Sequence, residues 1–444
     1  MLWFRRDLRL HDHPALHAAA AAADGGRVVP LFVVDPALWG PAGAPRRAWL
    51  RRSLQALDAS CDGRLVLRQG APAEVLPRLV AQLDAGSVHI SADAGPYGRR
   101  RDEALGAALD VPLQPTGTPY AVGPGTITKA DGSPYQVFTP FSRAWREHGW
   151  PAPAGPPPTG LRWARGVDSD PWPDEPDLAG VQLPDVGEAA ALERWQDFRD
   201  EALADYGTDR DRPDLDGTSS LSAHLKYGEI HPRTLLADLA RQRGEGAETF
   251  RTELAWREFY ADVQWHRPAS AREHLRPQFA RLDHDAPGDA FDAWTQGRTG
   301  FPFVDAGMRQ LRAVGWMHNR LRMITASFLV KDLHVEWQQG ARYFLRWLRD
   351  GDLASNNQGW QWVAGSGTDA APYFRVFNPV SQGQRCDPDG AYVRRWVPEL
   401  AHLPGASAHT PWATPDGYQH GYPERIVDHA AERQEALRRY AAIR

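Results

Sequence analysis

The segment from residue 350 to residue 362 combines side chains that bind polar ligands with side chains that can be oxidised. It reads DGDLASNNQGWQW, with two aspartates, three adjacent amides and two tryptophans. Carboxylates and amides supply many hydrogen-bond donors and acceptors, and indole rings supply flat apolar surface. This combination predicts a binding site for a redox-active aromatic cofactor.

A predicted helix over 248–266 carries Glu253, Trp256 and Arg257, whose spacing of three and four residues places them on one face. Such a face can contact a ligand. The same spacing fits an amphipathic helix with an interfacial tryptophan and a surface arginine equally well.

A second predicted helix, over 318–332, has Asn319, Arg322 and Met323 on one face. The run that follows is apolar enough to be buried, so we expect Asn319 and Arg322 to need buried polar partners. Asp350 or Asp352 could pair with Arg322.

A hydroxyl-rich loop, Gly217–Ser222 with the sequence GTSSLS, precedes another helical segment. Backbone N–H groups at the start of a helix, together with hydroxyls, make a good phosphate site. An ordinary helix cap explains the same residues, and the loop taken alone favours the cap.

Trp360 and Trp362 are two residues apart, which puts them on opposite faces of a strand or about 200° apart on a helix. One ring can therefore face a bound cofactor while the other faces a cleft. Trp337, in a preceding helix, could stand between Trp360 and the surface. For most of the 18 tryptophans of this chain, core packing is the better explanation.

Other groups of potentially reactive residues do not predict a metal site, a nucleotide motif or a catalytic nucleophile. His11–Asp12–His13 resembles a metal pair, but no further ligands cluster nearby, so a loop or capping role is favoured and no metal site is predicted. The chain has neither a G-x-G-x-x-G nor a Walker motif, and no serine or cysteine stands in a recognisable nucleophile setting. Its two cysteines, Cys61 and Cys386, fit a reducing compartment.

Alternating strands and helices predict an α/β domain over residues 1–125. Strands are expected at Met1–Phe4, Val28–Val34, Leu65–Arg68 and Val88–Ser91, and helices at Pro14–Ala23, Arg46–Leu57 and Ala73–Leu83. Continuous apolar strands separated by helices are typical of a doubly wound, Rossmann-like parallel sheet.

The remainder predicts a long linker followed by an all-α domain. Residues 126–186 form the extended linker, because the proline density of Pro151–Val186 excludes helix and central strand. Residues 187–444 form the helical domain, with helices expected over 188–206, 231–243, 248–266, 305–314, 318–332 and 341–348.

Composition places the chain among globular proteins, with 42% hydrophobic and 24% charged residues. We expect a cytoplasmic protein, because no run of about 18 apolar residues could span a membrane and the charged N-terminus does not resemble a signal peptide. We also expect a monomer. A net charge of −5 does not point to nucleic acid, although a local basic groove could still bind it.

Five blocks of sequence, in this order, resemble the DNA photolyase/cryptochrome family, and within it the class I cyclobutane pyrimidine dimer photolyases. They are WFRRDLRLHDHPAL, GTSSLSAHLKYGEI, ELAWREFY, GWMHNRLRMITASFLVKDL and DGDLASNNQGWQWVAGSGTDAAPYFRVFNP. The resemblance covers almost the whole chain. It implies an antenna-type α/β domain and a helical domain that binds FAD and DNA.

The resemblance implies a U-shaped FAD in the helical domain. Its phosphates and ribose would be held by Tyr206, Thr218, Ser219, Ser220, Leu221 and Ser222. Asp350 and Asp352 would flank the isoalloxazine and the adenine, with Arg322 paired to Asp350. Asn356 would face the flavin N5, where asparagine favours the fully reduced anionic flavin. Trp256 is assigned to the cofactor as well as to the substrate.

The same resemblance implies that the substrate is a cyclobutane pyrimidine dimer in UV-damaged DNA. The pocket of such enzymes matches Glu253, Trp256, Asn319, Met323 and Trp362, whereas (6-4) photoproduct enzymes have histidine at the positions of Asn319 and Met323. The two tryptophans would form an apolar wall for a flipped dimer, and Glu253 and Asn319 would hydrogen-bond its thymine edges. Contacts to phosphates and the damaged strand are assigned to Arg210, Arg257, Arg320 and Gln382.

The implied reaction is light-driven electron transfer by a carbon–carbon lyase. Photoexcited reduced FAD donates an electron to the dimer, the cyclobutane bonds split, and the electron returns. Glu253 would stabilise the dimer radical anion through a hydrogen bond. Trp360 and Trp337 match the first two of the three tryptophans that usually carry electrons to the flavin.

Two positions depart from the family pattern. The third tryptophan, ten residues before Trp294, is His284 here, so we expect flavin photoreduction to be slower or to leave through Trp294 or a tyrosine. Relatives with a folate antenna have glutamate where this chain has Gln114, so a deazaflavin, a second flavin or no antenna are all open.

Two other functions compete with repair. One is a cryptochrome-type blue-light receptor without repair activity, and the other is a flavoprotein that binds DNA without turnover. The sequence favours the enzyme, because the five-residue pocket is intact and only about 45 residues follow Val397–Leu400, where receptors often add a long tail.

Overall fold

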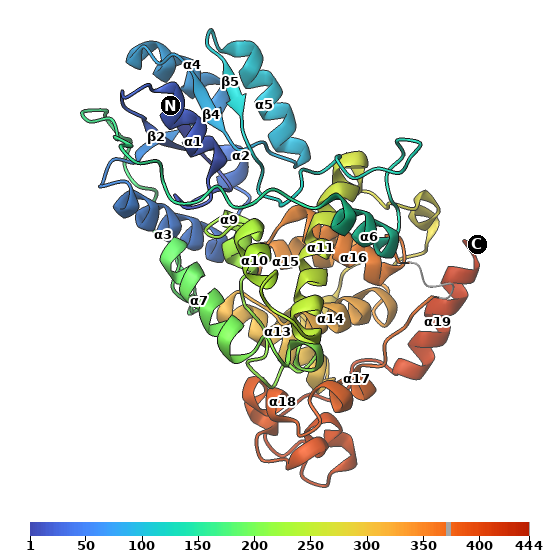
Figure 1. The fold of residues 1–444 in the computed structure, drawn as a ribbon. Coiled ribbons are helices and arrows are strands. Elements are labelled where there is room, and N and C mark those ends of the chain that lie inside the picture. The colour runs from blue at the N-terminus through green and yellow to red at the C-terminus, as the bar shows by residue number, and fades with distance from the viewer. Residues whose placement is uncertain (370–373, 444) are drawn as a thin grey trace. The chain divides into compact units, whose positions relative to one another are not determined.

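Parallel pairing of short, buried strands builds the α/β part of the molecule (Figure 1). In this computed structural model, which describes residues 1–369 and 374–443, the strands are β1 Leu2–Phe4, β2 Pro30–Val34, β3 Val66–Gln69, β4 Val88–Ile90 and β5 Leu113–Pro115. Their order is β3-β2-β1-β4-β5, and every pair is parallel. The predicted doubly wound sheet is confirmed. Strand β5 was not predicted because its three residues, Leu-Gln-Pro, have no apolar pattern; Leu113 is partly exposed and the other two are exposed.

Alternation along the strands sends neighbouring side chains to opposite faces of the sheet. Leu2 and Phe4 join one buried cluster, while Trp3 between them joins another. The helices of this part are α1 Pro14–Ala22, α2 Pro36–Trp39, α3 Ala44–Ser60, α4 Pro72–Leu83 and α5 Pro96–Ala108. The central strands β1, β2 and β4 are therefore buried on both sides, as their continuous apolar sequences require.

The predicted linker has two different parts. Helix α6, Phe138–His148, lies within 126–186, so the expectation of extended chain has to be corrected for those residues. The helix is amphipathic, and its buried residues pack against helix α11, Glu245–His266, which is distant in sequence. Residues 151–186, all of which the structure describes, contain neither helix nor strand, as expected from their prolines.

The extended part covers the open edge of the sheet. Asp170 N donates to the carbonyl oxygen of Leu67 at 3.0 Å, and Leu67 N donates to Ser169 Oγ at 2.9 Å. The carboxylate of Asp170 also accepts from Gln69 N at 2.7 Å. An edge strand exposes a row of backbone groups that invites pairing with other chains, so this segment satisfies the outer edge of β3.

The chain after residue 187 folds as helices, which confirms the all-α prediction for this half. The α-helices are α7 Glu188–Glu201, α8 Tyr206–Asp209, α9 Ser222–Tyr227, α10 Pro232–Leu239, α11, α12 Asp289–Gln296, α13 Pro302–Val314, α14 Asn319–Lys331, α15 Trp337–Trp347, α16 Leu353–Ala364, α17 Pro379–Cys386, α18 Ala391–Trp396 and α19 His429–Ala441. Short 3-10 turns are η1 Pro268–Ala271, η2 Pro277–Arg281, η3 Pro398–Leu400, η4 Gly405–His409 and η5 Pro411–Ala413. None of the described helices is long and apolar enough to cross a membrane.

Two compact units make up the chain. The first contains Met1–Leu178, Pro184–Ala204 and Ser219–Pro268, and the second contains Ala179–Leu183, Asp205–Thr218 and Ala269–Arg444. Helices α9, α10 and α11 thus belong to the unit that holds the sheet. The functional domains predicted from the sequence have boundaries at residues 125 and 186. The compact units have different boundaries, so the functional domains stay a prediction.

A buried aspartate ties the first residues of the chain to helix α10 within the first unit. The fully buried carboxylate of Asp12 accepts from Arg233 Nη2 at 2.9 Å, from Ala154 N at 2.7 Å and from Thr234 Oγ1 at 3.2 Å. A buried charge is tolerated only when it is paired and hydrogen-bonded in this way. Asp12 therefore acts as a structural clamp between segments about 220 residues apart.

The histidine next to this aspartate is a helix cap. His13 Nδ1 accepts from Leu16 N at 3.1 Å at the start of α1. Among the described residues, no three metal-ligating side chains cluster together. The capping bond of His13 and the hydrogen bonds of Asp12 agree with the loop or capping role that the sequence favours for His11–Asp12–His13.

Acid should destabilise the first unit, because a buried histidine must become charged. His231 is 1% exposed, its Nε2 donates to Thr118 O at 2.9 Å, and desolvation lowers its pKa from 6.5 to about 3. A histidine with a lowered folded pKa contributes stability that is complete above pH 6.5 and is lost as the pH falls. We expect urea unfolding to show a loss of roughly 1.4 kcal/mol per pH unit for this proton below about pH 6.

The variant His231→Gln should reduce this slope by one proton. His148→Gln, at an exposed position, is the control and should keep the slope of the unaltered protein. An unchanged slope in His231→Gln would mean that other groups carry the acid sensitivity.

Candidate cofactor and substrate site

Asp352 determines where helix α16 begins. Its side chain accepts from Ser355 N at 3.0 Å, and its carbonyl accepts from Asn356 N at 2.9 Å. An aspartate at this position satisfies a backbone N–H group and complements the positive end of the helix dipole. Residues 350–352 therefore form a loop and 353–364 a helix, so the helical alternative for the tryptophan pair is the correct one.

The two tryptophans of α16 lie in different surroundings. Trp360 is 3% exposed and meets Phe344 edge to face, with 4.9 Å between ring centroids. Trp362 is partly exposed, and the guanidinium carbon of Arg375 lies 5.3 Å from its ring centroid. One ring is internal and the other is near the surface, as expected for residues about 200° apart on a helix.

Helix α15 approaches Trp360 so closely that only glycine fits at residue 340. A Cβ atom on Gly340 would lie 2.1 Å from Cη2 of Trp360 and 2.6 Å from Cδ2 of Leu329. The indole Nε1 is buried and has no hydrogen-bond partner among the described residues. A polar group bound beside the ring would satisfy this N–H.

The predicted ion pair of Asp350 is present. Arg322 Nη2 donates to Asp350 Oδ2 at 2.7 Å, and Arg322 Nε donates to the carbonyl oxygen of Met317 at 2.8 Å. Asp350 is 5% exposed. Charge-assisted bonds of this length are the strong ones, so the pair fixes the loop before α16 against helix α14.

Most amides of this stretch bind protein backbone, which corrects part of the ligand-binding prediction. Asn357 Nδ2 donates to Ala271 O at 2.5 Å, and Gln358 Nε2 donates to Ser270 Oγ at 2.8 Å. Gln361 Nε2 donates to Ser270 O at 2.7 Å. Buried backbone groups need such partners, and a sequence does not distinguish an inward amide that binds backbone from one that binds a ligand.

Asn356 is the amide of this stretch that suits a ligand. Its Nδ2 donates to Ala341 O at 3.2 Å and to Asn357 Oδ1 at 2.8 Å. Both N–H groups are thereby used, so the orientation of the amide is set. The partly exposed side chain presents its oxygen as the group for a bound molecule.

Trp337 is buried and donates Nε1 to His274 Nδ1 at 3.3 Å. His284, at the position where the resemblance expects a third tryptophan, is half-buried with its Nδ1 3.3 Å from His334 O. Burial lowers the pKa of His284, so the ring is neutral. A neutral imidazole does not replace an indole as an electron donor.

A second line of aromatic rings runs outward from Trp360. Ring centroids are 6.3 Å apart for Trp360 and Trp294, 5.6 Å for Trp294 and Tyr343, and 6.3 Å for Tyr343 and Trp347. Trp347 is partly exposed. The sequence predicted that electrons leave through Trp294 or through a tyrosine that it did not specify. The packing of α12, α15 and α16 identifies this tyrosine as Tyr343 and adds Trp347.

In the first unit, helix α11 carries Glu253 and Trp256, both partly exposed. Trp256 stacks face to face on Phe138, with 3.6 Å between centroids and 6° between ring planes. Phe138 belongs to α6, within the segment expected to be a linker. It covers one face of the Trp256 ring.

The side chain of Arg257 binds other residues of the first unit. Its Nη1 donates to Pro119 O at 3.0 Å, its Nη2 donates to Leu225 O at 3.1 Å, and its guanidinium carbon lies 4.4 Å from the Tyr120 ring centroid. These contacts give the side chain a structural role and lend no support to the predicted contact with DNA.

The hydroxyl-rich loop contains a strained residue. Ser220 has φ 52°, in the left-handed region that serine rarely adopts and that clusters at functional sites. The residue before helix α9 is Leu221, whose side chain cannot cap a helix, so the capping explanation does not account for the loop. The chain passes from the second unit to the first between Thr218 and Ser219, and Ser222 is the first residue of α9.

Asn319 is exposed, so the expectation that it needs a buried partner is wrong. It is the first residue of α14, and the buried face of that helix begins two residues later at Leu321. Its Nδ2 lies 4.0 Å from Sδ of Met323, one turn along. The two side chains form a partly open face, as a substrate pocket needs.

The other residues predicted to contact DNA interact with neighbouring side chains in the second unit. Arg320 forms an ion pair with Asp211, Gln382 accepts from Arg385 Nη2, and Arg210 lies 5.8 Å from the ring of the buried Tyr206. All three are partly exposed. Their contact with DNA stays a prediction.

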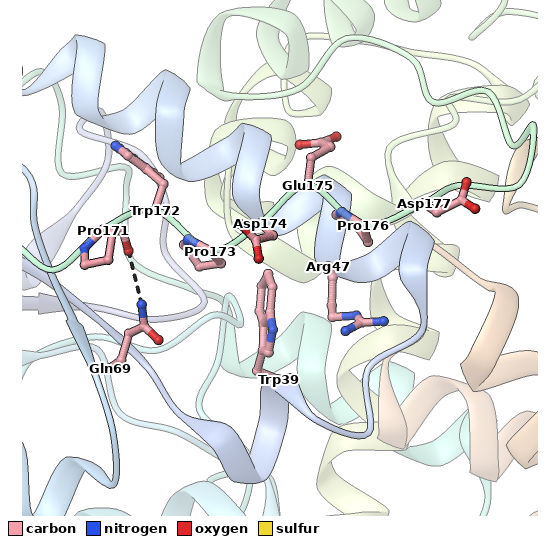
Figure 2. A pocket seen from close by; sticks show the side chains of 10 residues that line it. All are labelled: Trp39, Arg47, Gln69, Pro171, Trp172, Pro173, Asp174, Glu175, Pro176 and Asp177. Carbon is pink, nitrogen blue, oxygen red and sulfur yellow. Dashed lines mark hydrogen bonds between the residues drawn. The ribbon is translucent and has the colours of Figure 1, made fainter.

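A cavity of about 620 Å³ lies in the first unit, where Pro171–Asp177 crosses Trp39 and Arg47 (Figure 2). Gln69 Nε2 donates to Pro171 O at 3.1 Å, and Glu175 pairs with arginines of α3. The described lining includes none of the residues predicted for the site. The cavity is therefore a feature of how the proline-rich segment packs on the α/β part.

Comparison with known proteins identifies related sequences and structures over the whole chain. Residues 1–159 match the family model described as DNA photolyase, and residues 250–442 match the FAD binding domain of DNA photolyase. A deoxyribodipyrimidine photo-lyase of Agrobacterium fabrum is 39% identical, over 100% of this chain and 98% of its own. A bacterial class III photolyase structure from Agrobacterium tumefaciens has a TM-score of 0.90 at 39% identity, covering 100% of this chain and 97% of that one. A Synechocystis cryptochrome structure has a TM-score of 0.88 at 27% identity, covering 98% of each chain.

Gly340→Ala should displace Trp360. The added methyl group would lie 2.1 Å from the indole, so the ring or the helix must move. Overpacking of this kind costs roughly 1–3 kcal/mol. We expect a lower Tm, measured by circular dichroism.

Gly359→Ala on α16 is the matched control, because a Cβ there meets no described atom within 4 Å. Alanine in place of a helical glycine is favourable by up to about 1 kcal/mol, so this variant should melt at or above the Tm of the unaltered protein. Equal Tm values for the two variants would contradict the close approach of Gly340 to Trp360.

Proposed function

The chain belongs to the DNA photolyase family, and from this premise we propose that it splits cyclobutane pyrimidine dimers in UV-damaged DNA with light as the energy source. The observation that carries the proposal is helix α16 with its preceding loop. It combines a paired, buried Asp350, an oriented Asn356 and a buried Trp360 whose indole N–H has no hydrogen-bond partner among the described residues. These are the features that a flavin-dependent electron transfer enzyme needs along one edge of its cofactor.

The residues present fit FAD. The strained, hydroxyl-bearing loop around Ser220 suits a diphosphate, and the buried indole N–H and the amide oxygen of Asn356 suit a polar ring system. FAD, when bound and reduced, supplies the electron that light drives into the dimer. In this proposal Tyr206 and residues 218–222 hold its phosphates and ribose, and Asp350 and Asp352 hold its two ends.

The protein's own part in the reaction is to bind and orient. Trp256 and Trp362 offer ring faces on which an unstacked dimer can rest. Phe138 keeps the Trp256 indole in one plane by stacking on it. In this proposal Glu253 forms a hydrogen bond with the dimer, and the resemblance assigns Asn319 and Met323 to the same substrate. No general base or nucleophile takes part in this scheme.

Residues 1–125 are proposed as an antenna-type domain and residues 187–444 as the domain that binds FAD and DNA. With a net charge of −5, contact with DNA has to be local, at Arg210, Arg320 and Gln382. A cytoplasmic monomer is the simplest form for such an enzyme. Gln114 is exposed on β5, where a folate antenna would call for glutamate, so the choice among a deazaflavin, a second flavin and no antenna stays open.

A cryptochrome-type receptor is the second candidate, because one structure of similar fold is a cryptochrome. That structure is 27% identical over 98% of this chain, whereas the photo-lyase relative is 39% identical over 100% of it. The intact pocket of Glu253, Trp256, Asn319, Met323 and Trp362 also favours repair. A receptor would bind FAD and respond to light without restoring the thymine absorbance of a dimer.

Blue light should restore the ultraviolet absorbance of thymine when the reduced protein is mixed with an oligonucleotide that contains a thymine dimer. Trp256→Leu should weaken dimer binding about fivefold to a hundredfold, because base–aromatic stacking contributes roughly 1–3 kcal/mol. Glu253→Gln should lower the repair yield. Both should keep their FAD.

Trp265→Leu, on the same helix but outside the pocket, is the control and should bind the dimer as the unaltered protein does. The repair function would be refuted if FAD were bound and reduced in the unaltered protein and no absorbance returned.

Photoreduction of the flavin should run through the second line of rings. Trp294→Phe should slow it more than Trp337→Phe, because Trp294 contacts both Trp360 and Tyr343, whereas the next ring after Trp337 is missing at His284. The measurement is transient absorption with a thiol as the external reductant. Repair by chemically reduced protein should be unaffected.

His284→Trp should restore a fast route through Trp337 and make Trp294→Phe harmless. Fast photoreduction in Trp294→Phe without that change would contradict the assigned route.

A further inference from the structure

Helix α14 ends in a lysine that is buried. Lys331 is 2% exposed, its ammonium donates to the carbonyl oxygen of Arg375, and it lies 4.2 Å from the ring centroid of Phe374. An ammonium group taken out of water is costly unless it is held by partners. Desolvation lowers the pKa of Lys331 to about 7, against the attraction of Asp369 and Asp332.

Phe374 is fixed on several sides within the second unit. Its ring stacks on Tyr440 of α19, with 4.4 Å between centroids and 9° between planes. It also rests on Gly365, the residue that ends α16, where a Cβ would lie 3.0 Å from Phe374 Cε2. With Lys331 on the same ring, these contacts place the next residue, Arg375, against α16.

Arg375 reaches the ring that is proposed as part of the substrate wall. Its guanidinium carbon lies 5.3 Å from the Trp362 centroid, and its Nη2 lies 3.7 Å from Asp369 Oδ1. The side chain is 36% exposed, so it can also meet DNA. A guanidinium is attracted to an indole face, and its planar fork matches a phosphate.

We propose that Lys331 is a positioning residue that acts on the substrate through Arg375. The buried ammonium holds the Arg375 backbone so that its guanidinium orients Trp362 and binds the phosphate next to the flipped dimer. Lys331 itself touches no DNA. This inference rests on the proposed repair function and adds Arg375 to the residues that bind the damaged strand.

The proton on Lys331 makes this arrangement sensitive to pH. The charged groups that face it are Asp332, Asp369 and Arg375, and Asp332 is hydrogen-bonded to His429 of α19. The ammonium is present below pH 7 and is lost as the pH rises. Because a neutral amine makes a weaker hydrogen bond than an ammonium, dimer affinity should fall between about pH 6.5 and 8.5.

The test measures dark binding of a thymine-dimer oligonucleotide to the FAD-loaded protein by fluorescence anisotropy. Lys331→Met and Arg375→Gln should each weaken binding about threefold to thirtyfold, the range of a cation–π contact. The double variant should bind no worse than the weaker single variant, because both changes remove one coupled unit. Lys331→Met should also abolish the decline of affinity with pH.

Arg342→Gln, an exposed arginine of α15, is the control for loss of one surface charge and should bind as the unaltered protein does. Additive losses, or a Lys331→Met variant with the original affinity and pH profile, would overturn the proposal. If Lys331→Met does not fold, normal affinity in Arg375→Gln or a flat pH profile of the unaltered protein overturns it instead. Failure of the unaltered protein to repair would count against the function, whereas repair with unaffected variants counts only against the positioning role.

Discussion

The close approach of helix α15 to helix α16 is the contact on which the proposed site depends. Gly340 leaves room for the Trp360 ring, and the next residue, Ala341, accepts the hydrogen bond that orients Asn356. One helix surface therefore sets both the indole and the amide. Another polar face of α16 is hydrogen-bonded to Ser270 and Leu275, through the side chains of Gln358 and Gln361, and these bonds restrain the rotation of the helix.

Buried charges repeatedly join segments that are far apart in the sequence. Asp12 holds α10 in the first unit, Arg322 and Asp350 join α14 to α16 in the second, and Lys331 holds the residues after 373. Each charge loses hydration and regains partners, so the net gain in stability is small. What such groups add is a defined arrangement, because few other placements of the chain would satisfy them.

The sequence predicted well wherever a local pattern decides the structure. The parallel sheet and most long helices follow from apolar periodicity, and the family resemblance follows from the motifs. Helix α6 was missed because its place next to the proline-rich residues 151–186 outweighed a short amphipathic pattern. Asn319 was expected to need a buried polar partner because the apolar run beginning at Met323 was extended back to the first residue of the helix, which is exposed.

The sequence by itself determined the family, the two classes of fold and the residues whose chemistry suits FAD and a pyrimidine dimer. It did so because motifs and periodicity are local in the chain. Only the tertiary structure showed that Asn356 suits a ligand whereas Asn357 binds backbone. It also placed Phe138 on Trp256 and Arg375 over Trp362. The segment from 350 to 362 is one run of similar residues in the sequence, but packing against different neighbours gives its members different tasks. Those neighbours are distant in the chain, and side-chain roles that depend on them exist only after folding.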